Sequence, residues 1–142
     1  MAAFNKFQQF VQDLAEKVHN LTTDTINVYL SNAAPSASLD AVKTDMAEIA
    51  TGNGYTGPQD TQNTGAEATG TYTLTGTKIV ITATGAVGPF QYVVLYNDTP
   101  TSPVDPLIGW WDYGSPISLA NGETFSIKFN NSDTTGTILT IA

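Results

Sequence analysis

The chain has 142 residues, enough for one domain with one hydrophobic core, and carries 13 Asp and Glu against five Lys, a formal net charge of −8. The sequence contains no Arg and no Cys, which argues against nucleic-acid binding, since that needs a basic face, and excludes disulfides and thiolate metal sites. No apolar run approaches the roughly 20 residues of a membrane-spanning helix or the apolar stretch of a signal peptide, so we expect no membrane partner.

Residues 1–22 are expected to form an N-terminal amphipathic helix. Apolar side chains recur there at spacings of three and four and form one stripe, while polar residues take the opposite side. The stripe contains Phe4, Phe7, Phe10, Val11, Leu14, Val18 and Leu21. Two interpretations remain open from the sequence: the helix packs on the core of its own domain, or it docks on a neighbouring subunit.

The next three segments differ in character. Residues 25–32 alternate Ile26, Val28 and Leu30 with polar neighbours and predict a strand. Residues 39–54 place apolar side chains at helical spacing and end in Gly-Asn-Gly, which predicts a short helix or helical turn. Residues 55–70 are rich in Gly, Thr, Gln and Asn. They predict a long exposed loop or arm, either mobile or ordered on assembly.

Residues 71–142 are expected to form the main β region. Runs of β-forming residues in 71–84, 90–98, 106–114 and 135–142 predict strands. The Asn121-Gly122 step is a strong hairpin signal, and it is followed by Phe125, Ile127 and Phe129 at alternate positions. Six to eight short strands separated by turn signals indicate a mainly β fold. We expect a β-sandwich or jelly-roll-like domain that spans residues 1–142 as a single domain.

Candidate catalytic and metal-binding residues are few. His19 lies near the end of the predicted helix, where a histidine commonly complements the helix dipole. No tight-turn motif presents a Ser nucleophile to it. The Asn- and Asp-rich segments 96–105 and 130–136 do not have the spacing of a calcium loop. We therefore expect no catalytic residues, no metal ion and no cofactor. The protein is accordingly expected not to be an enzyme.

The adjacent tryptophans Trp110 and Trp111 are the most distinctive local feature. Neighbouring side chains on a strand point to opposite faces. This places Leu107, Gly109, Trp111 and Tyr113 on one face and Ile108, Trp110 and Asp112 on the other. A flat sugar platform made of both rings is therefore disfavoured. One Trp can fill the core, and the other is expected to contact the helix stripe or another subunit. The candidate contact residues are Phe4, Phe7, Phe10, Trp110, Trp111 and Tyr113.

The overall pattern of the chain resembles a family of small proteins found among the structural genes of tailed bacteriophages. The resemblance runs from FNKFQQFVQDLAEKVHNL and DTINVYLSNAAP, through EIATGNGYT and VVLYNDT, to LIGWWDYG, ISLANGETFSIKF and TILTIA. It covers nearly the full length and transfers no catalytic residues.

The resemblance implies a virion component, first of all a capsid decoration (cement) protein. Such a protein would be made in the bacterial host cytoplasm and would bind the major capsid protein on the outer capsid surface. It would act as a homo-oligomer such as a trimer, and weak contacts repeated over the lattice would add up. The alternative is a tail, neck or fibre component that takes part in head–tail assembly or binds a receptor or glycan.

Overall fold

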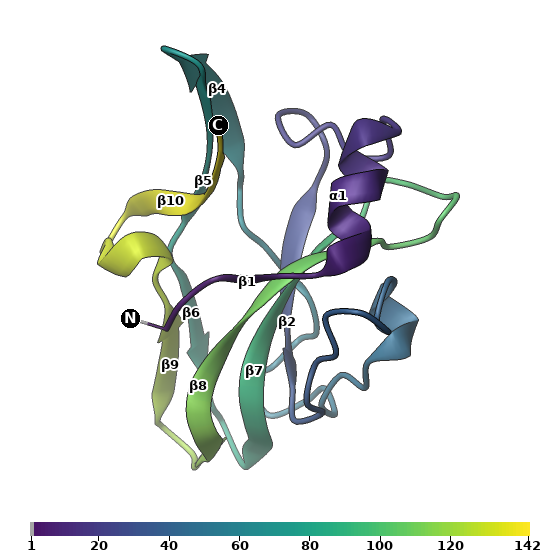
Figure 1. The fold of residues 1–142 in the computed structure, drawn as a ribbon. Helices are drawn as coiled ribbons and strands as arrows, with labels where there is room; N and C mark the ends of the chain where they lie inside the picture. Colours follow the sequence, from purple (N-terminus) through teal and green to yellow (C-terminus); the bar gives the residue numbers. More distant parts are fainter. Residues whose placement is uncertain (1) are drawn as a thin grey trace.

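The computed structural model describes residues 2–142 and confirms a mainly β fold, arranged as two packed layers of antiparallel strands (Figure 1). The larger sheet has the order β1 (Asn5–Lys6), β8 (Leu107–Leu119), β7 (Val87–Asn97), β2 (Ile26–Ser31) and β3 (Gln59–Asp60). The second layer contains β10 (Thr135–Ile141), β5 (Thr71–Thr77) and β4 (Thr64–Ala68), followed by the pair β6 (Ile79–Thr82) and β9 (Thr124–Ile127). β5 and β6 are separated by the single residue Lys78, so the two small sheets follow one another along the chain. The result is a β-sandwich.

Apolar side chains cover both faces of the larger sheet. The main core lies between the two layers and includes Val28, Leu30 and Trp111. A second cluster, on the other face of the larger sheet, includes Phe7, Tyr29, Met46, Val94, Tyr96 and Leu107. All six residues of β2 are buried. The strand prediction for residues 25–32 is therefore confirmed. The face that carries the polar neighbours is buried as well, because Tyr29 packs in the second cluster with Met46.

The N-terminal helix is much shorter than the expected span of residues 1–22. Helix α1 comprises Gln8–Ala15, and Asn5 and Lys6 instead pair with Trp110 and Gly109 of β8. Phe7 has an extended backbone at the start of the helix, since pairing with β8 outweighs helix propensity there. Phe10 packs into the main core, so α1 packs on the β-sandwich of the same chain.

The segment of residues 39–54 contains one helical turn. A 3-10 turn covers Lys43–Asp45, and the Asp45 carboxylate accepts hydrogen bonds from the backbone N–H groups of Ala41 and Val42, at 2.8 and 3.0 Å. Leu39, the first member of the expected apolar stripe, is 81% exposed. The helical spacing of this stretch therefore reflects one capped turn, which is too short for an amphipathic face.

Residues 55–70 are only partly an exposed arm, and the expectation of a continuous loop with little to bury is wrong. Tyr55 is fully buried, and its hydroxyl accepts a hydrogen bond from the Leu30 N–H at 3.1 Å and donates one to Glu48 at 2.8 Å. Burial raises the pKa of Tyr55 well above its ordinary value, so this hydroxyl keeps its proton. Strand β3 then pairs with β2, and β4 pairs with β5 in a hairpin that projects from the sandwich (Figure 1).

The Asn121-Gly122 turn joins the two layers instead of closing a hairpin. Strand β8 before the turn pairs with β7, and β9 after it pairs with β6. The Gly122 N–H donates to the Ala83 carbonyl at 2.7 Å, which fixes the turn against the end of β6. The turn prediction holds, but the two strands diverge after it. Across residues 2–142, no helix has the length and apolar character needed to cross a membrane.

Candidate interaction site

Trp110 and Trp111 point to opposite faces of β8, as predicted. Trp111 is 8% exposed and packs in the main core, with ring centroids 5.4 Å from Phe4 and 5.8 Å from Phe129. Trp110 is partly buried beside the second cluster, 4.6 Å from the ring of Phe7. The two rings therefore anchor two different clusters, and the disfavoured sugar platform does not form.

The predicted assignment of side chains to the two faces of β8 is wrong for its first two residues, Leu107 and Ile108. Leu107 belongs to the second cluster, on the side of Trp110, and Ile108 belongs to the main core with Trp111. The register between β7 and β8 shifts between the pairs Leu95–Gly109 and Tyr96–Leu107. Such a bulge reverses the alternation of side chains, and the sequence pattern gives no sign of it.

The six candidate contact residues separate into two groups. Phe7, Phe10 and Trp111 are buried inside the chain's own fold. This burial agrees with the interpretation that the helix packs on its own domain and that one Trp fills the core, and it leaves these three side chains inaccessible to another subunit. Their apolar side chains fill the two clusters of the chain's own core. Phe4 and Trp110 are partly buried, and Tyr113 is 58% exposed. Tyr113 is therefore the member of the set that is most accessible to a partner.

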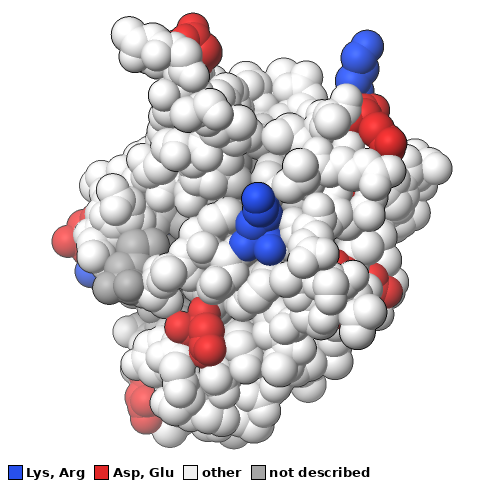
Figure 2. All heavy atoms as spheres, in the orientation of Figure 1, with Lys and Arg blue, Asp and Glu red and all other residues white. Residues whose placement is uncertain are grey.

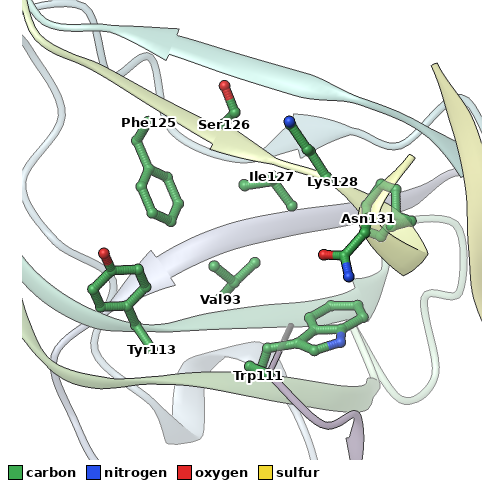
Figure 3. A pocket seen from close by; sticks show the side chains of 10 residues that line it. Val93, Trp111, Tyr113, Phe125, Ser126, Ile127, Lys128 and Asn131 are labelled. Carbon is green, nitrogen blue, oxygen red and sulfur yellow. The ribbon is translucent and has the colours of Figure 1, made fainter. Parts of the chain in front are cut away.

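Tyr113 stands beside a cavity of about 270 Å³ between the two layers. We call it the seam cavity. It is lined by Ala2, Val93, Trp111, Tyr113, Phe125, Ser126, Ile127, Lys128, Phe129 and Asn131. Figure 3 shows Phe125 and Ile127 pointing from β9 toward Val93, Trp111 and Tyr113, whereas Ser126 and Lys128 point away from them. The cavity wall is consequently apolar and largely aromatic.

The strands on either side of the seam cavity have open edges in the described part of the chain. β1 pairs with β8 at Gly109 and Trp110, and beyond these residues no strand among residues 2–142 continues this pairing. Strand β9 pairs with β6 on one side, and no strand of the described chain pairs with its other side. Unpaired edges present free backbone donors and acceptors to a partner.

Sequence reasoning missed Val93, Phe125, Ile127 and Phe129 as members of this site. The alternation after Asn121-Gly122 does place Phe125 and Ile127 on one face, which was the available signal. The missing information was that β9 leaves β8 after the turn and faces it across a gap. The phenyl ring of Phe125 lies 4.9 Å from Phe90 and 6.1 Å from Tyr113, so it bridges the core and the exposed edge.

Charge is thinly spread around the site. In the orientation of Figure 1, charged side chains lie scattered over a mostly uncharged surface (Figure 2). Lys128 forms an ion pair with Asp133 at 2.7 Å, and its hydrogen bond and charge lower the pKa of that exposed carboxyl. The surface near the seam cavity can therefore be covered by a partner without desolvating many charges.

His19 is a buried hydrogen-bonding group beyond the end of α1. The Asn97 side-chain amide donates to His19 Nδ1 at 3.1 Å and to Asp24 at 2.7 Å. Because the amide nitrogen can only donate, Nδ1 accepts and the proton sits on Nε2. Burial lowers the pKa of His19, while Asp13 and Asp24 oppose that shift. The position differs from the expected dipole-complementing site on the helix, because α1 ends four residues earlier.

Comparisons of the chain with protein-family models, with curated proteins and with solved structures gave no match. The protein is a β-sandwich with an aromatic cavity that opens between its two layers.

Proposed function

We propose that this protein is a non-enzymatic structural component of a tailed-bacteriophage particle, and that it binds the outer surface of the capsid lattice and stabilises it. The observation that supports this proposal best is the seam cavity with its exposed Tyr113 and open strand edges. Apolar, aromatic surface on a rigid scaffold is typical of protein–protein contact sites.

The physical properties of the chain suit a protein that coats a repeating lattice. A capsid presents the same contact many times, so a modest affinity per copy is sufficient when oligomeric copies bind together. The projecting β4–β5 hairpin extends the reach of the sandwich toward a neighbour. The net charge of −8 favours solubility at high copy number.

In this proposal the partners are the major capsid protein and further copies of the chain, assembled as a homo-oligomer such as a trimer. The test is the copy number in purified particles. Quantitative mass spectrometry should find the chain at a one-to-one ratio to the major capsid protein, or at a simple fraction of it. A handful of copies per particle would contradict lattice binding.

A tail, neck or fibre component that binds a receptor or glycan is the second candidate. The exposed Tyr113, next to an aromatic cavity with Asn131 at its rim, supports it, because aromatic rings flanked by polar groups bind sugars as well as proteins. Block of phage adsorption by the free protein, together with binding on a glycan array, would favour this candidate. Neither effect is expected for a capsid decoration protein.

A further inference from the structure

The seam cavity is large enough to receive a whole side chain from another molecule. An apolar cavity of about 150 Å³ already binds benzene, and this one measures about 270 Å³. Phe125, Ile127, Val93 and Trp111 converge on it from both layers (Figure 3). The space thus matches one aromatic or branched aliphatic side chain that enters past Tyr113.

We propose that the seam cavity anchors one bulky apolar side chain of an extended, non-basic segment of the capsid subunit. This inference rests on the proposed function and names the contact that carries it. The segment lies along the seam, and its side chain fills the space between β8 and β9.

The open strand edges explain why the occupant is a polypeptide segment. Beyond Trp110 the edge of β8 has no strand partner within residues 2–142, and the seam cavity lies directly beside that stretch, at Trp111 and Tyr113. An extended chain can hydrogen-bond to an open edge while alternate side chains enter adjacent pockets. A free small molecule would leave the strand edges unpaired.

The charge of the seam explains why the segment is non-basic. Two further hollows continue the seam from the cavity: one is lined by Phe4, Trp111 and Leu139, and the next by Phe4, Lys6 and Phe10. Across the three hollows the charged side chains are Lys6 and Lys128, and no Asp or Glu side chain of the described residues lines them. Lys128 points away from the cavity and is paired with Asp133, so the charge that faces a partner along the seam is that of Lys6 (Figure 3). In a chain with 13 acidic residues, this strip favours an uncharged or acidic partner.

The test is binding of the purified protein to capsids from which it has been stripped, measured by co-sedimentation. Tyr113→Lys puts a charge at the mouth of the cavity. The matched control is Val104→Lys, because Val104 is also 58% exposed but lies outside the seam. Tyr113→Lys should weaken binding at least about tenfold, with a melting temperature close to that of Val104→Lys, and Val104→Lys should bind like the wild type.

A second variant approaches the cavity from its floor. Val93→Phe fills the space without adding charge, and it should weaken capsid binding as Tyr113→Lys does while the chain stays folded by circular dichroism. If the wild type binds capsids and both seam variants bind equally well, the seam proposal is overturned and the proposed function stands. If the wild type does not bind stripped capsids, the proposed function fails and the named partner fails with it.

Two other occupants are separate outcomes of the same experiment. In one, light scattering finds that the free wild-type protein is a dimer and that the Tyr113→Lys variant is a monomer. That result would assign the cavity to a second copy of the chain. A small apolar molecule that copurifies, seen by native mass spectrometry, would assign it to that ligand. Either result overturns the capsid anchor.

Discussion

Replacing each tryptophan by alanine should destabilise the protein to different extents. Trp111 is 8% exposed and contacts Phe4 and Phe129. A buried Trp removes about 200 Å² from water, worth about 5 kcal/mol at 25 cal/mol per Å². Large-to-small changes in cores cost about 3–5 kcal/mol. Because the seam cavity lies against Trp111, neighbours can relax into the gap, so we expect Trp111→Ala to cost about 3–4 kcal/mol.

Trp110→Ala should cost less, about 2 kcal/mol, because Trp110 is partly buried at the margin of the second cluster. Urea unfolding followed by far-ultraviolet circular dichroism measures both values, provided that the slope of the transition is unchanged between variants. A loss for Trp110→Ala that equals or exceeds the loss for Trp111→Ala would refute the assignment of Trp111 to the core.

Three further predictions address other parts of the fold. Tyr55→Phe should lower the free energy of unfolding by about 1–3 kcal/mol, measured by urea denaturation, because the buried Leu30 N–H loses its acceptor. Because burial lowers the pKa of His19 below its ordinary 6.5, the unfolded chain binds the proton more readily. Thermal unfolding across a pH series should therefore show full stability above pH 6.5 and a loss as the pH falls below it. Gly109→Ala should lower the unfolding midpoint and expose the N-terminal segment to limited proteolysis, since a Cβ there would collide with the Phe4 ring and with the backbone of β1.

Each of these predictions has a control on the same chain. Tyr113→Phe removes a hydroxyl from an exposed side chain and should change stability by less than about 0.5 kcal/mol. His19→Gln should flatten the pH dependence just below pH 6.5, the ordinary pKa of the imidazole that the variant lacks; an unchanged pH profile would contradict the role of His19. Ser118→Ala, at an exposed position of β8, should leave proteolysis at the N-terminus as it is in the wild type.

The candidate site was partly predictable. The Trp110–Trp111 pair showed by alternation alone that the two rings serve opposite faces of one strand, and Tyr113 was among the expected contact residues. Phe7 and Phe10 were also among them but serve the core, because a stripe of apolar residues looks the same whether it meets its own domain or a neighbour. The cavity itself depends on β9 facing β8 across a gap. These two strands are not hydrogen-bonded to each other, since β9 pairs with β6 and β8 pairs with β7, so no local pattern in the sequence indicates that they face each other.

The sequence by itself determined the β-rich composition, the strand at residues 25–32, the turn at Asn121-Gly122 and the opposite directions of the two tryptophans. These features follow from local periodicity and turn chemistry, which act over a few residues. Only the tertiary structure decided that α1 ends at Ala15, that Tyr55 is buried and that the two layers leave the seam cavity open. Each of these depends on contacts between residues far apart in the chain, such as Asn5 with Trp110 and Tyr55 with Leu30, and long-range contacts override local propensity when they bury more surface or satisfy more hydrogen bonds.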